Sequence, residues 1–196
     1  RKHINGKIEQ NINNVLNHGK FILGPEVFDL EEKLCNYIGT DYCITCSSGT
    51  DALMMSLMCL GIGRDDEVIT SPFSFISSAE VIALLGAKPV FVDIEIDTFN
   101  LDFRKLEEKI SKKTKAIIPV SLFGQCANFT EINKIAKKYN IPVIEDGAQS
   151  FGAELKGVKS GNLSNIGVTS FFPTKPLGCY GDGGAIFTKN KTYAEA

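Results

Sequence analysis

The chain has 196 residues, of which 43% are hydrophobic and 22% are charged, and its formal net charge is −2. This length and composition are enough for one sizeable α/β core, so we expect a single domain over residues 1–196. The near balance of 21 basic and 23 acidic side chains argues against a nucleic-acid binder or a polybasic membrane protein.

The first residues, which start at Arg1 rather than at methionine, lack the layout of a signal peptide. We therefore expect the chain to be part of a longer sequence. Its six cysteines are expected to be small, mostly buried side chains in a reducing cytoplasm. Cys43 and Cys46 form a C-x-x-C, but they lie on an expected strand that points them to opposite faces, and the only histidines are His3 and His18. We expect no metal site.

Helical periodicity marks the beginning of the chain. Residues 1–19 carry apolar side chains near a period of 3.6, and His18-Gly19 suits a helix end. A second helix is expected to start at Pro25, with Val27, Leu30, Leu34 and Ile38 on one face.

From residue 42 the predicted elements alternate. Strands are expected at 42–46, 67–70, 88–92, 115–120 and 142–145, and helices at 50–60, 75–85, 102–110 and 128–139. Short strands follow near 167–172 and 184–188, with glycine-rich turns between them. Alternating strands and helices predict a mostly parallel sheet covered on both faces, which is a three-layer α-β-α architecture.

The segment from Ser47 to Leu53 follows a strand and opens a helix. Free backbone N–H groups at such a helix start favour a phosphate. Gly49 would let the backbone approach closely, and Ser48 and Thr50 add hydroxyl donors. The alternative is an ordinary capped helix, because serine and threonine are good N-caps.

Two further segments carry polar or aromatic groups at strand ends. Phe73 and Phe75 follow the strand at 67–70, where an aromatic ring could stack on a flat ligand, although this segment alone favours two core side chains. Glu145 and Asp146 end the strand at 142–145. A carboxylate there could pair with a protonated heterocyclic nitrogen; a metal ligand or a helix cap is the alternative.

Lys175 lies in a mostly apolar segment rich in glycine and proline. A lysine that is desolvated in such a place loses its proton more easily and becomes a nucleophile. A surface lysine in a loop is the alternative. Four glycines between residues 178 and 184 imply unusual backbone angles or tight contacts, but they do not form a Walker loop, and no G-x-G-x-x-G follows the first strand.

The order of these segments is more specific than any one of them. Ser48-Gly49-Thr50-Asp51-Ala52-Leu53, Glu145-Asp146-Gly147-Ala148-Gln149, Ser170-Phe171-Phe172-Pro173-Thr174-Lys175 and Gly181-Asp182-Gly183-Gly184-Ala185 together resemble the DegT/StrS-like sugar aminotransferases. These are pyridoxal 5'-phosphate (PLP) enzymes of fold type I, related to aspartate aminotransferase. The resemblance implies that this chain is the PLP-binding large domain, without the family's small C-terminal domain.

The resemblance also implies a role for each site residue. Lys175 corresponds to the lysine that holds PLP as a Schiff base and moves the proton, and Asp146 to the partner of the pyridine nitrogen. Gln149 would lie beside the ring hydroxyl, and Phe75 would stack on the ring. The phosphate would be bound near Ser48, by Gly49, Thr50 and Ser170.

The expected reaction moves an amino group from an amino acid, such as glutamate, to a nucleotide-linked keto sugar. Residues 169–185 are most similar to enzymes that act on UDP-linked 3-keto sugars. Relatives with histidine in place of Lys175 perform dehydration, so a sugar dehydratase is one alternative and an inert or regulatory relative is another. A homodimer with shared active sites is expected, and the segment from Phe21 to Pro25 is expected to approach the partner's site.

Overall fold

The structure is a computed structural model, and it describes residues 6–196. Its helices are α1 (Lys7–His18), α2 (Pro25–Ile38), α3 (Gly49–Cys59), α4 (Ser77–Leu84), α5 (Phe129–Lys138) and α6 (Lys191–Glu195). Its strands are β1 (Tyr42–Cys46), β2 (Glu67–Thr70), β3 (Lys88–Phe91), β4 (Thr114–Ile118), β5 (Ile144–Asp146), β6 (Glu154–Leu155), β7 (Val158–Lys159), β8 (Ile166–Ser170) and β9 (Gly184–Thr188). Among these residues, no helix combines the length and the apolar character that a membrane span requires.

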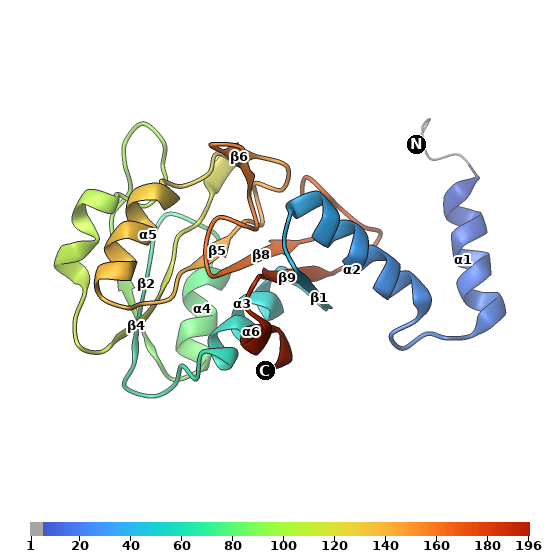
Figure 1. Cartoon of the computed structure of the whole chain (residues 1–196), viewed down its shortest axis with the longest axis horizontal. Helices are drawn as coiled ribbons and strands as arrows, with labels where there is room; N and C mark the ends of the chain where they lie inside the picture. The colour runs from blue at the N-terminus through green and yellow to red at the C-terminus, as the bar shows by residue number, and fades with distance from the viewer. Residues whose placement is uncertain (1–5) are drawn as a thin grey trace.

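The central sheet consists of two hydrogen-bonded groups of strands that meet at β4 and β5. The orders are β1-β9-β8-β5 and β3-β2-β4. Parallel bridges from Ile117 to Val143 and from Val120 to Asp146 join the two groups. β9 runs antiparallel to both β1 and β8, whereas the pairs β2–β3, β2–β4 and β5–β8 are parallel. The predicted mostly parallel sheet is confirmed (Figure 1).

Helices cover both faces of this sheet, as the three-layer prediction requires. Buried side chains of α3 and α4, including Leu57 and Ile82, pack with Val68 and Val168 against one face. On the other face, α5 packs Phe129 and Ile132 against strands β2, β4 and the chain before β5. α2 extends that second layer, where Leu34 and Ile38 contact Phe187 of β9. Alternate residues along the strands therefore pack against opposite layers of helices.

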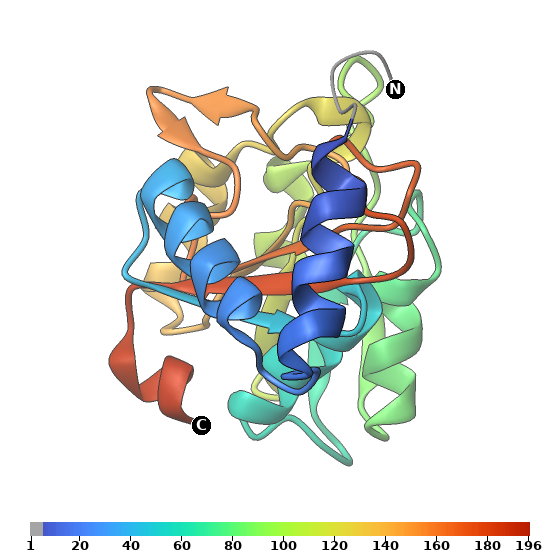
Figure 2. The ribbon, with the colours of Figure 1, turned by 90° about the vertical axis from the view of Figure 1, so that its right-hand side faces the viewer.

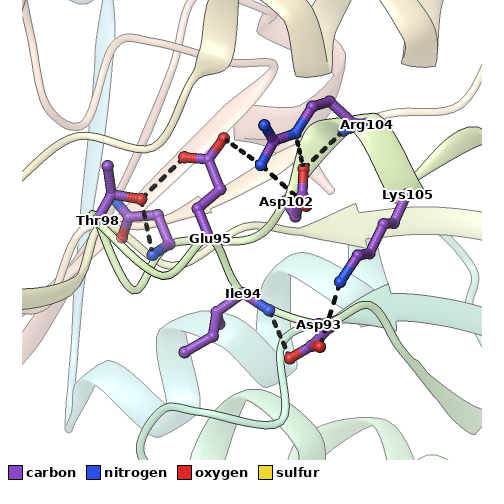
Figure 3. A network of polar contacts seen from close by, with 8 residues as sticks. Asp93, Ile94, Glu95, Thr98, Asp102, Arg104 and Lys105 are labelled. Atoms are coloured by element: carbon purple, nitrogen blue, oxygen red, sulfur yellow. Dashed lines mark hydrogen bonds and ion pairs between the residues drawn. The ribbon is translucent and has the colours of Figure 1, made fainter.

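The helix predicted at 102–110 is wrong. The chain instead forms two 3₁₀ turns, η1 (Phe103–Lys105) and η2 (Glu107–Lys109). The Asp102 carboxylate accepts hydrogen bonds from the backbone N–H and the guanidinium of Arg104, which also contacts Glu95 (Figure 3). These local bonds favour tight i→i+3 turns over a continuous α-helix. The hairpin of β6 and β7 and the short α6 also had no counterpart in the sequence prediction.

The first helix projects from the rest of the molecule. α1 has no buried residue, and its Ile12 and Leu16 are exposed. It lies apart from the sheet and its covering helices at the right-hand side of Figure 1, and in Figure 2 it lies in front of them. The predicted start of this helix, within residues 1–5, lies outside the described residues. An isolated helix of this length is marginal in water, so its apolar side needs a partner surface.

The close packing of β8 yields a stability prediction. A Cβ added at Gly167 would lie 2.2 Å from the backbone oxygen of Gly161, which cannot move away as a flexible side chain could. We expect Gly167→Ala to lower the free energy of unfolding by about 1–3 kcal/mol. Urea unfolding followed by circular dichroism measures the change.

Gly63→Ala is the matched control, because nothing lies within 4 Å of a Cβ added there. Equal midpoints for the two variants would contradict the described packing of β8 against residue 161.

Candidate active site

The site residues that the resemblance implies all line one pocket of about 470 Å³, whereas the other two candidates, Phe73 and Glu145, do not line it. The pocket is at the carboxyl ends of the parallel strands, where open α/β sheets bind ligands. The residues are Ser48, Gly49 and Thr50 from the start of α3, Phe75 before α4, Asp146 and Gln149 from the end of β5 and the turn after it, Ser170 from β8, and Lys175 from the turn after β8.

The start of α3 provides a place for an anion. Ser48 is the N-cap, and its Oγ accepts a hydrogen bond from the N–H of Asp51 at 3.0 Å. The N–H of Ala52 donates to the Ser48 carbonyl, so the first-turn N–H groups of Gly49 and Thr50 remain for a ligand. The capped-helix interpretation and the anion-site interpretation are therefore compatible, because capping occupies Ser48 and leaves the helix end open.

Gly49 is required by the close approach of a neighbouring strand, whereas the expectation from the sequence was the close approach of a phosphate. A Cβ at this position would lie 2.7 Å from the Cβ of Ser170 at the end of β8. The glycine therefore lets the end of β8 approach the start of α3. As a result, the Ser170 side chain and the N-terminus of α3 border the same part of the pocket.

Asp146 ends β5 with a side chain that is 4% exposed. Its Oδ2 accepts a hydrogen bond from the Ser78 hydroxyl at 2.8 Å, and its Oδ1 accepts one from the Ala148 N–H at 3.2 Å. Burial raises the pKa of the carboxyl, while these two bonds and the positive charge of Lys175 oppose the rise. Lys175 and Asp146 both line the pocket.

Lys175 is half-buried in a compact turn that follows β8. Its backbone N–H donates to the Phe172 carbonyl at 2.8 Å, and the Cys179 N–H donates to Phe171 at 2.8 Å. Gly178 fits this turn because a Cβ there would lie 2.7 Å from the Pro173 oxygen. Gly183 and Gly184 also lie close to neighbouring atoms, whereas nothing lies within 4 Å of a Cβ added at Gly181. None of the four glycines of residues 178–184 has a positive φ.

The two carboxylates at the end of β5 point to different environments. Glu145 is fully buried and accepts hydrogen bonds from Ser160 Oγ at 2.7 Å and from the Gly161 N–H at 2.9 Å. Because side chains alternate along a strand, only Asp146 of this pair lines the pocket. The Glu145 carboxylate instead joins residues 160–163 to β5 by hydrogen bonds.

The sequence prediction missed several residues of the pocket. Asp182 and Leu122 line it, and Ser78 lies behind Asp146. Leu122 belongs to a 3₁₀ turn that no periodicity marks. A signal for Ser78 exists in retrospect, since Ser77 and Ser78 are two buried hydroxyl residues at the start of a mostly apolar helix.

Comparison with known proteins agrees with this arrangement. The sequence profile of the DegT/DnrJ/EryC1/StrS aminotransferase family matches residues 2–196. The chain is 60% identical over 193 residues to UDP-2-acetamido-2-deoxy-3-oxo-D-glucuronate aminotransferase of Pseudomonas aeruginosa, an alignment that covers 98% of this chain and 54% of the relative.

Two solved structures show the same fold. A DegT DnrJ EryC1 StrS aminotransferase from Brucella abortus is 44% identical with a TM-score of 0.96, and the match covers 100% of this chain and 54% of that one. The E. coli GDP-4-keto-6-deoxy-D-mannose-3-dehydratase with bound hydrated PLP is 30% identical with a TM-score of 0.89, covering 95% and 49%. The chain thus spans about half the length of these proteins.

The burial of Glu145 yields a prediction for the pH dependence of stability. Burial raises the pKa of this carboxyl from 4.5 to about 7, against its hydrogen bonds to Ser160 and to backbone N–H groups. Between these pH values the folded protein holds a proton that the unfolded chain has released. The contribution of Glu145 to the free energy of unfolding therefore falls as pH rises through this window, by up to roughly 3 kcal/mol.

Urea unfolding of the wild type and of Glu145→Gln at pH values from 4 to 8 measures this contribution. We expect the wild type to lose stability relative to the variant as pH rises. A difference between the two proteins that stays constant over the window would contradict a raised pKa.

Proposed function

The chain belongs to the DegT/DnrJ/EryC1/StrS aminotransferase family, and we propose that it is the PLP-binding large domain of a nucleotide-sugar aminotransferase. The observation that carries this proposal is the pocket itself. Segments of the chain that begin near residues 48, 75, 146 and 170 meet there and provide an anion site, an aromatic ring, a buried carboxylate and an amine.

The residues of the pocket fit the chemical groups of PLP. The N-terminus of α3, with Thr50 and Ser170, suits a phosphate dianion. Asp146 provides a buried negative charge for a protonated pyridine nitrogen, and Phe75 offers a ring for stacking. Gln149 supplies an amide for the ring hydroxyl. When bound, PLP supplies an electron-accepting ring that stabilises negative charge on a substrate carbon.

Lys175 performs two tasks in this proposal. Its amine first provides the covalent attachment point for the cofactor aldehyde. Nζ would also act as the acid–base group that moves the proton of the substrate carbon that bears nitrogen. The position of Lys175 at the pocket, half-buried and near Asp146, supports both tasks.

We propose a UDP-linked 3-keto sugar as the amino acceptor and an amino acid such as glutamate as the donor. The support for the acceptor is the 60% identity to the Pseudomonas aeruginosa aminotransferase that is named for a UDP-linked 3-oxo sugar. A dehydratase is also among the similar structures, at 30% identity. The lysine at position 175 favours amino transfer over dehydration, because dehydrating relatives carry histidine there.

A homodimer in the cytoplasm completes the proposal. Exposed apolar side chains on α1 and on the link after it support a second copy as the covering surface. They are Ile12, Leu16, Phe21, Ile22 and Leu23. Free cysteines within residues 6–196 are consistent with a reducing compartment.

The first prediction from this proposal concerns Lys175. After incubation with PLP and removal of the excess, we expect a visible absorbance band that Lys175→Ala abolishes. We also expect this variant to lower amino transfer from glutamate to a UDP-linked 3-keto sugar by about 10²- to 10⁴-fold, measured on the protein that carries this chain.

Lys189→Ala, which removes an exposed lysine at the end of β9, is the control and is expected to keep the band. A colourless wild type would favour an inert relative, and a band that survives in Lys175→Ala would contradict the assigned amine.

A second prediction concerns the dimer. Ile22→Asp places a charge on the exposed apolar link, where the wild-type side chain is 89% exposed. We expect sedimentation velocity to show a dimer for the wild type and a larger monomer fraction for this variant, since an apolar interface excludes an unpaired charge. Ile96→Asp, at another exposed isoleucine, is the control. A wild-type monomer would contradict the proposal.

A further inference from the structure

The hydroxyl of Ser78 is the only side-chain donor bonded to Asp146 among the described residues. Ser78 is 1% exposed and lies in the first turn of α4, so water does not compete for its hydroxyl. Its partner carboxylate is almost as deeply buried. We propose that Ser78 is a positioning residue that orients the Asp146 carboxylate and keeps it ionised for the bound cofactor, an inference that rests on the proposed function.

The electrostatic surroundings make this hydroxyl necessary. Burial favours the neutral form of Asp146. The neighbouring carboxyl on the same strand is Glu145, whose own pKa is raised to about 7. From the facing elements, Lys175 is the cation, and Asp182 adds a second acid at the pocket. When the Lys175 amine is bound to the aldehyde, it no longer provides a free ammonium group. The Ser78 hydroxyl, the Ala148 N–H and the positive N-terminal end of α4 would then support the anion together with the protonated pyridine nitrogen.

The same bond also fixes the segment that carries the stacking ring. Phe75 lies three residues before Ser78 and is 67% exposed, so few contacts of its own hold it. The bond from Ser78 to Asp146 joins the first turn of α4 to the end of β5. It therefore sets the distance between the strand that carries the carboxylate and the segment that carries the ring.

Three variants and one control test the role of this hydroxyl. Ser78→Ala removes the donor, Ser78→Thr keeps it, and Ser78→Cys keeps a similar volume with a weak donor. Ser56→Ala is the control, because Ser56 is equally buried on α3 but donates to the Ala52 carbonyl of its own helix. Urea unfolding identifies the variants that fold, and Ser78→Cys replaces Ser78→Ala if the alanine variant does not.

The first readout does not depend on activity. In the protein without cofactor, the ¹³C chemical shift of the Asp146 carboxyl is followed against pH. We expect the pKa to be higher in Ser78→Ala than in the wild type, restored in Ser78→Thr and unchanged in Ser56→Ala. An unchanged pKa in Ser78→Ala would overturn the proposal, because a hydrogen bond to the charged form must stabilise it.

The second readout uses the enzyme loaded with PLP. We expect Ser78→Ala to lower kcat by about 10- to 100-fold with little change in the KM of the sugar, as for loss of a hydrogen bond to a charged group. The pH at which the visible band changes should also move, and Ser78→Thr should restore both properties. Wild-type values in Ser78→Ala, with the band still dependent on Lys175, would refute the role of Ser78 alone. Loss of the Lys175 dependence would refute the proposed function.

Discussion

A buried carboxylate is the constraint on which the rest of the pocket depends. Asp146 lies at the end of a central strand with 4% of its surface exposed, where an ionised group is costly unless donors and a cation surround it. The structure supplies those groups from three directions: the Ser78 hydroxyl from α4, the Ala148 N–H from the following turn, and Lys175 from the turn after β8. A cationic heterocycle bound above it would be the strongest of these partners.

The topology of the sheet explains why these groups meet. β5 and β8 are parallel neighbours, so their carboxyl ends deliver Asp146 and Ser170 to the same edge. β9 returns antiparallel between β8 and β1, and a Cβ at its first residue, Gly184, would lie 2.4 Å from the Ser48 oxygen. The start of α3 is therefore packed against both strands without space for larger side chains. The start of α3, the Asp146 carboxylate and the Lys175 amine therefore border one pocket.

The sequence was sufficient to predict the elements that a regular pattern of apolar residues marks. Strands at 42–46, 67–70 and 184–188 were predicted with the observed bounds, because their apolar runs end at glycine or polar residues. Apart from Phe75, the site residues were predicted from four ordered motifs, and the structure places them with Phe75 around one pocket. The prediction of a helix at 102–110 failed because the spacing of apolar residues does not reveal the local bond between Asp102 and Arg104. Ser78 was missed because its hydrogen-bond partner, Asp146, is 68 positions away in the sequence. Assigning Asp146 to the pocket and Glu145 to the opposite face required the direction of each side chain.

Peptide mapping after borohydride reduction tests the central claim most directly. The protein is loaded with PLP, reduced so that any imine becomes a stable secondary amine, digested and analysed by mass spectrometry. The account predicts one modified peptide, with the pyridoxyl phosphate group on Lys175 and a lower yield when Asp146 is replaced by alanine. Modification of another lysine, or labelling spread over surface lysines without preference, would contradict it.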